Sequence, residues 1–212
     1  KSQMTAKDAV ETVWACDKNN YPLQVANISM TGSDTINIAN RLFQHNALNL
    51  NVGEKIKIIN PEMGDIMTLS LPNFGAVVSN LPFVPFEIIP DDDKAEISKM
   101  PLADNLDGRS DLYCYIATKI ADVIKPGGML GIIVSNSWLG TKSGIKFVEV
   151  LKQKYNMRQV HISGKGRWFK NVDVVTTIII LEKKANNDRS DTEFWLWKLS
   201  LEQLAENSDA EN

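Results

Sequence analysis

Short apolar runs alternate with amphipathic segments along most of the chain. The apolar runs are as short as strands, and the run 174–181 is dense in β-branched residues, whereas the other segments repeat their apolar residues at helical spacing. Strands that alternate with helices predict an α/β fold in which helices flank a mostly parallel sheet. The expected strands are 12–16, 41–44, 76–78, 130–134, 158–162, 174–181 and 193–199, and the expected helices are 21–30, 112–123 and 143–155.

Two segments depart from this alternation. Residues 55–59 and 66–69 alternate apolar with polar side chains around a Pro-Glu-Met-Gly turn, which is typical of a β-hairpin. The polar stretch 87–108 carries three consecutive aspartates at 91–93. We expect this stretch to be an exposed, mobile loop whose acidic run is solvated rather than a cation site. The helix after it is expected to begin with Ser110 as its N-cap.

The length predicts a single domain. The chain has 212 residues, somewhat more than the ~150 of a typical domain, and its 43% hydrophobic content is enough for one large core. That core is expected to cover about 12–184, followed by a terminal strand and an acidic tail in 185–212. Because the chain starts with Lys1 rather than methionine, we expect a domain that is incomplete at its N-terminal side.

Charge, hydropathy and cysteine usage argue against several classes of protein and of site. A net charge of −3 argues against a chain that grips duplex DNA by itself, since phosphate neutralisation dominates that affinity. No apolar run approaches the ~18 residues of a membrane span. Cys16 and Cys114 lie far apart in apolar runs, as expected in a reduced, cytoplasmic compartment. His45 and His161 have no partner at ligand spacing, so we expect no metal site.

Two predicted strands end in residues that can do chemistry. Ligands of open α/β sheets bind beyond the carboxyl ends of the strands. Asp17 follows the first strand, where a carboxylate can accept both hydroxyls of a ribose, although a helix cap or turn residue is the commoner use of aspartate there. The strand 76–78 leads into Ser-Asn-Leu-Pro-Phe at 79–83. These two strand ends are therefore the candidate site.

The segment 79–83 resembles the Asn-Pro-Pro-Phe/Tyr motif of amino-group methyltransferases that use S-adenosylmethionine, above all the adenine-N6 DNA methyltransferases of restriction-modification systems. The resemblance covers roughly residues 12–184 and implies a Rossmann-like fold and methyl transfer to the N6 amine of adenine in DNA. Further segments that match the family in its order are 111–113, 125–128, 135–139, 166–169 and 174–183.

The resemblance implies a catalytic role for Asn80, Leu81, Pro82 and Phe83. Two acceptors aimed at the N–H groups of the adenine amine make its nitrogen more nucleophilic, and the Asn80 amide oxygen and the Leu81 carbonyl would supply them. The base must first be flipped out of the duplex, after which Phe83 would stack on it. Phe169 is the candidate for the other face of the base, a role that Trp168 could exchange with it.

The same resemblance implies S-adenosylmethionine as the cofactor, held by Asp17, Asn46 and Ala47. The family commonly has aspartate at the position of Asn46, and an amide oxygen accepts hydrogen bonds less strongly than a carboxylate. Asp65 is a rival for that role if the hairpin is absent, and Asn46 can also be a simple turn residue. The family also has proline where this chain has Leu81, although Pro82 still favours an extended backbone there.

The family's glycine-rich turn after the first strand has no counterpart before Asp17. Gly164 and Gly166 form a Gly-x-Gly pair, but they follow the wrong strand. We therefore expect the first strand and its turn to be missing, and the isolated chain to have little cofactor affinity and to be inactive.

Two alternatives to a DNA methyltransferase stay open. One is a non-catalytic, degenerate methyltransferase-fold module for DNA positioning or assembly, which Leu81, Asn46 and the absent turn favour. The other is an enzyme that methylates a protein glutamine or an RNA amine, because the same acceptors suit any planar amine. Since the chain shows no concentrated basic surface, we expect target DNA to be read by a missing domain or a partner subunit.

Overall fold

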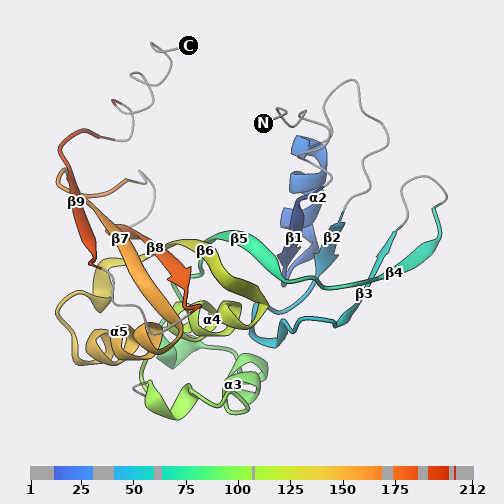
Figure 1. Cartoon of the computed structure of the whole chain (residues 1–212), viewed down its shortest axis with the longest axis horizontal. Helices are drawn as coiled ribbons and strands as arrows, with labels where there is room; N and C mark the ends of the chain where they lie inside the picture. Colours follow the sequence, from blue (N-terminus) through green and yellow to red (C-terminus); the bar gives the residue numbers. More distant parts are fainter. Residues whose placement is uncertain are drawn as a thin grey trace. The chain divides into compact units, whose positions relative to one another are not determined.

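The computed structural model describes residues 12–30, 41–59, 64–106, 108–168, 174–185, 191–200 and 203. The chain divides into two compact units, Lys1–Pro72 and Asn73–Asn212. Each unit has its own sheet or sheets, and Figure 1 shows the elements of both in sequence colours.

The first unit begins with a β-α-β arrangement, as the sequence predicts. Strands β1 (Trp14–Asp17) and β2 (Arg41–Gln44) pair in parallel, with Asp17 opposite Gln44. Helix α2 (Asn20–Met30) lies between them in the chain, with proline in its first turn, where the missing N–H costs no helical hydrogen bond. A 3-10 helix, η1 (Ala47–Asn49), follows β2.

The predicted hairpin is confirmed. Strands β3 (Lys55–Ile59) and β4 (Ile66–Ser70) pair antiparallel, and Ile56 and Ile58 alternate as buried residues of β3. This alternation is what a sheet with one covered face produces.

The second unit contains a five-stranded sheet in the order β5-β6-β8-β7-β9. The β5–β6 and β7–β9 pairs are parallel, whereas β8 is antiparallel to both of its neighbours. The α/β class and the mostly parallel sheet are confirmed, because β5, β6, β7 and β9 run in one direction and β8 alone of these five strands is reversed. Its strands are β5 (Phe74–Asn80), β6 (Ile124–Ser135), β7 (Tyr155–Ser163), β8 (Thr176–Lys183) and β9 (Glu193–Trp197).

Helices α4 (Leu112–Ile120) and α5 (Lys142–Lys154) cover one face of this sheet, and Figure 1 shows them together on one side of it. The core between them is well packed, since Phe147 on α5 is fully buried and meets Tyr113 and Trp138 edge-on at centroid distances of 5.5 and 6.5 Å. The strand residues that face this core are also fully buried: Leu130, Ile132, Val134, Val160, Ile179 and Leu181.

The expectation of a loop over 87–108 is wrong. The described part of this stretch contains helix α3 (Asp91–Ile97) and two 3-10 helices, η2 (Phe86–Ile88) and η3 (Ala103–Asn105). The aspartates lie in the first turn of α3, where negative charge is stabilised by the helix dipole. Asp93 is buried, so the acidic run is not simply a solvated face.

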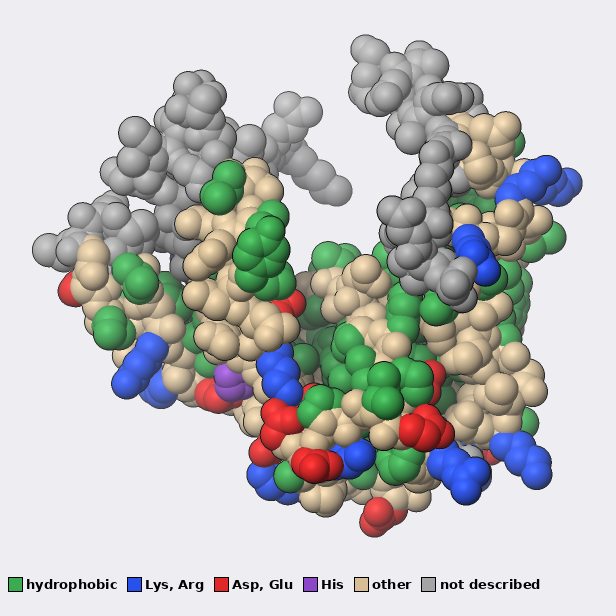
Figure 2. Space-filling view, turned by 180° about the vertical axis from the view of Figure 1, so that it is seen from behind, with side chains coloured by type: hydrophobic (Ala, Val, Ile, Leu, Met, Phe, Trp, Pro, Cys, Tyr) green, Lys and Arg blue, Asp and Glu red, His purple; other side chains and the backbone are tan. Residues whose placement is uncertain are grey.

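Charged side chains of both signs are interspersed on the face of the molecule drawn in Figure 2. Within the described residues on that face, no extended area carries Lys and Arg alone. In the described part of the chain, no helix is long and apolar enough to cross a membrane, and no group of three or more His, Cys, Asp or Glu side chains could hold a metal ion.

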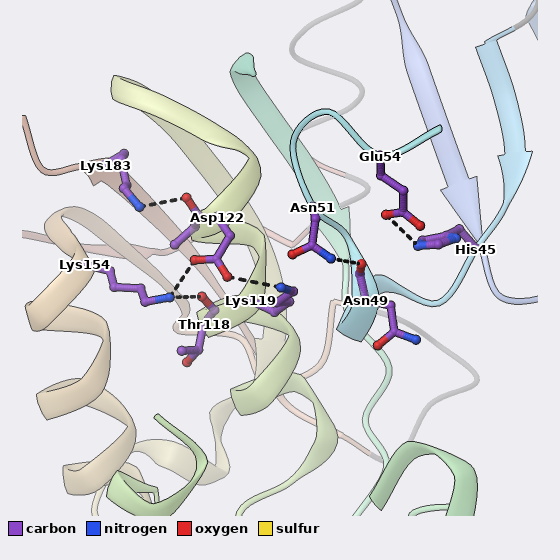
Figure 3. A network of polar contacts seen from close by, with 10 residues as sticks. His45, Asn49, Asn51, Glu54, Thr118, Lys119, Asp122, Lys154 and Lys183 are labelled. Carbon is purple, nitrogen blue, oxygen red and sulfur yellow. Dashed lines mark hydrogen bonds and ion pairs between the residues drawn. The ribbon is translucent and has the colours of Figure 1, made fainter. Parts of the chain in front are cut away.

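A cluster of lysines closes the C-terminal end of α4 (Figure 3). Asp122 accepts from Lys119 Nζ at 3.2 Å and from Lys154 Nζ at 2.8 Å, while Lys183 Nζ donates to the Ala121 carbonyl at 2.8 Å. Desolvation would raise the pKa of Asp122, but the two lysines outweigh it and lower the pKa below the usual range. Cations at a helix C-terminus stabilise it, so this cluster has a structural role.

We predict that Phe147→Ala lowers the free energy of unfolding by about 3–5 kcal/mol, because it leaves a cavity between two aromatic rings. Ile145 on the same helix is 60% exposed, so Ile145→Ala is the matched control and should change stability by less than about 0.5 kcal/mol. Urea unfolding followed by circular dichroism measures both. Equal effects of the two substitutions would contradict this core.

Candidate functional site

The carboxyl ends of β5 and β6 meet at one edge of the second unit's sheet. The strands are parallel, with Asn80 opposite Ile133, so β5 ends beside the last residues of β6. Strand β7 runs in the same direction as β6, because both are antiparallel to β8. The residues that follow all three strands therefore emerge at the same edge, where ligands of α/β sheets bind.

The acceptor segment Asn80–Phe83 leaves β5 in a fixed conformation. Leu81 N–H donates to the Ile133 carbonyl at 3.1 Å, and the Leu81 side chain is only 3% exposed. Phe83 is half-buried, and the carbonyl of the next residue, Val84, accepts from Leu112 N–H at 2.9 Å. Both ends of the segment are thus held by backbone hydrogen bonds.

The two hydrogen-bond acceptors that the sequence analysis predicts lie next to each other in this segment. Neither the Asn80 side chain nor the Leu81 carbonyl has a hydrogen-bond partner within the described residues. Asn80 also ends a shallow apolar groove on the sheet face. The groove is lined by Val78, Ser79, Asn80, Gly131, Ile132, Ile133, Ile178 and Ile180.

A hydroxyl network lies at the same edge and was not predicted. Ser137 Oγ is 2.6 Å from Ser135 Oγ and 3.2 Å from the Tyr113 hydroxyl, and it donates to Asp111 Oδ2 at 3.4 Å. Asp111, not Ser110 as the sequence suggests, occupies the N-cap position of α4. Burial raises the pKa of Asp111, and the nearby Glu87 adds to the rise, while the Ser137 hydrogen bond opposes it.

Three buried polar atoms of the second unit have no partner among the described residues: Ser110 Oγ, Trp168 Nε1 and Thr176 Oγ1. Ser110 precedes Asp111, and Thr176 lies opposite Ser135 in the β6–β8 pair. Buried groups of this kind usually bond to water or to a ligand.

The predicted cofactor residues belong to the first unit, at the carboxyl ends of β1 and β2. His45 N–H donates to the Asp17 carbonyl at 2.9 Å, which continues the parallel pairing. Asp17 Oδ1 accepts from Asn19 N–H at 2.7 Å, and Asn46 Oδ1 caps η1 by accepting from Leu48 N–H at 3.0 Å. Both side chains therefore have the local turn roles that the sequence allowed as alternatives.

Next to them, His45 Nε2 and Glu54 Oε2 lie 3.4 Å apart (Figure 3). Ala47 begins η1 directly after Asn46. Because the β3–β4 hairpin is present, the condition that made Asp65 a rival of Asn46 is not met. The half-buried carboxylate of Asp17, with no second partner on Oδ2 within the described chain, suits a ribose diol.

The structure thus brings Asn80, Leu81, Pro82 and Phe83 together, and it groups Asp17, Asn46 and Ala47 separately within the first unit. Phe169 lies outside the described residues. Trp168 is only 9% exposed, so it presents little ring surface for stacking on a base. The cysteines carry no site: burial raises the pKa of the Cys16 thiol to about 11 and raises that of Cys114 further.

We predict that Leu81→Pro destabilises the chain even though it restores the family's motif. Leu81→Ala should lower the free energy of unfolding by about 2–5 kcal/mol through the lost side chain. Leu81→Pro also removes the N–H donor to Ile133, which adds about 1 kcal/mol. Urea unfolding of the two variants measures the difference. A proline variant as stable as the unmodified chain would show that this hydrogen bond does not hold the segment.

The family model of the Eco57I restriction-modification methylases matches residues 11–169. The type II methyltransferase M.BanIII of Aneurinibacillus aneurinilyticus is 28% identical over 110 residues, which are 52% of this chain and 18% of that protein.

Two solved structures show the fold. The type IIG restriction endonuclease BpuSI matches with a TM-score of 0.65 and 15% identity, over 91% of this chain and 21% of its own. A class I S-adenosylmethionine-dependent methyltransferase from Listeria monocytogenes matches with a TM-score of 0.51 and 24% identity, over 68% of this chain and 43% of its own.

In each case, therefore, the chain spans less than half of the protein it matches. The fold is that of the Rossmann-like class I methyltransferases. Since the family model covers most of the sequence, the chain belongs to the Eco57I restriction-modification methylase family.

Proposed function

We propose that this chain is part of an enzyme that transfers a methyl group from S-adenosylmethionine to the N6 amine of a flipped adenine in DNA, within a restriction-modification system. The observation that carries the proposal is the pair of adjacent acceptors, the Asn80 side chain and the Leu81 carbonyl, at the carboxyl end of β5 in a member of this methylase family.

The acceptors address the main chemical difficulty. The lone pair of the adenine amine is delocalised into the ring, which makes the nitrogen a poor nucleophile. Hydrogen bonds from its two N–H groups to Asn80 and to the Leu81 carbonyl favour a tetrahedral nitrogen. Because the Leu81 amide and side chain are already held, the carbonyl is positioned before the substrate arrives.

Phe83 would bind the base by stacking. Its side chain, at the end of the acceptor segment, is half-buried, so part of the ring can contact a base. An adenine inside a duplex cannot reach this edge, so flipping precedes the reaction. Stacking on an aromatic side chain contributes about 1–3 kcal/mol per base.

The cofactor supplies an activated methyl group on a sulfonium centre. In this chain Asp17 would accept its ribose hydroxyls through the carboxylate, and Asn46 and Ala47 would contact its adenine part. The Oδ1 atoms of Asp17 and Asn46 already accept backbone N–H groups, which fixes the direction of both side chains.

We also propose that DNA is recognised through another domain or a partner subunit. Net charge is −3, and charges of both signs are interspersed over the described residues in Figure 2. Such a surface does not supply the phosphate contacts that dominate DNA affinity. The chain also spans only 18% of M.BanIII and 21% of BpuSI.

A second candidate is a non-catalytic module of the same fold. The sequence lacks a glycine-rich turn before Asp17 and has Leu81 and Asn46 where the family has proline and aspartate. Methyl transfer to a protein glutamine or an RNA amine is a third candidate. Tritiated methyl transfer to DNA, RNA and protein, measured in parallel with the full-length protein, separates the three: counts in DNA alone support the proposal, and counts in none of them favour the module.

We predict that Asn80→Ala in the full-length protein lowers the methyl-transfer rate by about 100-fold or more, since it removes one of the two proposed acceptors. Asn80→Asp keeps an acceptor and should retain more activity than alanine. Phe83→Ala should raise KM for DNA about 5- to 150-fold, from the lost stacking. Ile145→Ala, on the exposed side of α5, is the control and should match the unmodified enzyme. An active Asn80→Ala enzyme would overturn the assignment of the acceptor.

We predict that the 212-residue chain alone binds S-adenosylmethionine weakly or not at all, because its sequence offers no glycine-rich turn for the methionine part. Isothermal titration calorimetry measures this affinity. The Asp17→Ala chain serves as the control. If the unmodified chain binds S-adenosylmethionine tightly, the prediction is refuted. If Asp17→Ala abolishes that tight binding, the result supports Asp17 as a cofactor ligand.

A further inference from the structure

The Asp111 carboxylate makes no capping hydrogen bond to α4, the helix that Asp111 precedes. An N-cap aspartate normally accepts a backbone N–H of the first turn, and Asp111 has the extended N-cap backbone with φ −63° and ψ 156°. Its side chain makes no such bond. Instead, Oδ2 accepts from Ser137 Oγ, so the carboxylate is directed at the residues that follow β6.

Ser137 is the centre of a hydrogen-bond chain whose direction depends on that charge. A serine hydroxyl has one proton to donate and two lone pairs to accept with. An ionised Asp111 can only accept, so Ser137 donates to it. The Tyr113 hydroxyl and the Ser135 hydroxyl must then both donate to Ser137, which uses its hydrogen-bonding capacity fully.

This chain of hydrogen bonds links α4 and β6, the same two elements that hold the acceptor segment. Leu81 N–H is bound to Ile133 of β6, and the Val84 carbonyl is bound to Leu112 N–H, the residue after Asp111. The Asp111–Ser137 contact ties the start of α4 to the 3-10 helix η5 (Asn136–Trp138), which follows β6 directly. If it is lost, the first turn of α4 can move relative to β6, and Val84 moves with it.

Ionisation of Asp111 costs stability in the folded protein. The folded-state pKa of Asp111 is raised above its usual value, first by burial and also by Glu87, so the ionised form is disfavoured in the folded protein. The groups that face it are Glu87, Cys114 and Tyr113, with Ser137 as the hydrogen-bond donor. A raised carboxyl pKa lowers stability at pH values above the unfolded-state pKa, and this cost disappears as the pH falls below it.

We propose that Asp111 and Ser137 are positioning residues, which hold the acceptor segment Asn80–Phe83 in its productive conformation only while the Asp111 carboxylate is ionised. The inference rests on the proposed methyl transfer for its consequence in catalysis, but its structural part stands apart from it. Neither residue is expected to touch substrate.

The first experiment needs no activity. Amide hydrogen exchange of the 212-residue chain is measured by NMR for Leu81 and Leu112, with Ile132 and Ile179 in the central strands as internal references. Asp111→Asn removes the charge and keeps the shape, and Ser137→Ala removes the central hydroxyl. Both should speed exchange at Leu81 and Leu112 about tenfold and leave the references unchanged. Ser137→Thr, which restores a hydroxyl, and Asp104→Asn, at an exposed carboxylate, should match the unmodified chain.

The second experiment is the pH profile of methyl transfer by the full-length protein. In the unmodified enzyme, kcat should fall as the pH drops through the pKa of Asp111, because protonation of Asp111 removes the fixed direction of the hydrogen bonds through Ser137. Asp111→Asn should lower kcat about tenfold at neutral pH, with KM for S-adenosylmethionine within about twofold, and its profile should lose that acidic fall. Its melting temperature at neutral pH should not drop, since a costly charge has been removed.

The outcomes separate the two proposals. Unchanged exchange at Leu81 and Leu112 in both Asp111→Asn and Ser137→Ala overturns the positioning role, whatever the activity. An active enzyme whose Asp111→Asn variant keeps the acidic fall overturns the requirement for the charge. Altered exchange together with an unmodified protein that transfers no methyl group supports the positioning of the segment and refutes the proposed function.

Discussion

The parallel pairing of β5 with β6 is the constraint on which the candidate site depends. It places Asn80 opposite Ile133, and it lets Leu81 N–H continue the ladder by one more hydrogen bond after β5 has ended. That bond fixes the Leu81 backbone at the sheet edge, next to the exposed Asn80 side chain. A shift of the β5 register by one residue would move Asn80 to the opposite face of the sheet and dissolve the arrangement.

Most elements could be predicted because their signals are local. The apolar run 174–181 and the helical spacing in 112–123 depend only on which side chains are buried. Strand direction is not encoded in such a run, because a buried strand is apolar whether its neighbours are parallel or antiparallel, so the reversed direction of β8 could not be predicted from these residues. Helix α3 was missed for a different reason. Its first turn is acidic, which looks like a solvated loop but also suits a helix N-terminus.

The candidate site likewise contains one part that the sequence reveals and one part that it does not. Asn80 to Phe83 are consecutive residues, so a sequence motif can reveal them. The Asp111–Ser137 contact joins residues 26 positions apart, and Tyr113 to Ser137 spans 24. No spacing pattern predicts such a contact, because it forms only when α4 packs beside the residues that follow β6. Asp111 and Ser137 lie in the segments 111–113 and 135–139, which match the family in its order, but neither segment shows that the two residues touch.

At Leu81 the chain departs from the proline of the family pattern, and other interactions hold the backbone instead. Two successive prolines restrict the backbone through their rings, and neither ring can donate a hydrogen bond. Leu81 loses that rigidity but gains an N–H that donates to Ile133 and a side chain that is buried at 3% exposure. Pro82 still favours an extended backbone at Leu81. The carbonyl is therefore oriented by a hydrogen bond and by packing, and its position depends on the integrity of β6 and α4 more than it would in a proline-containing segment.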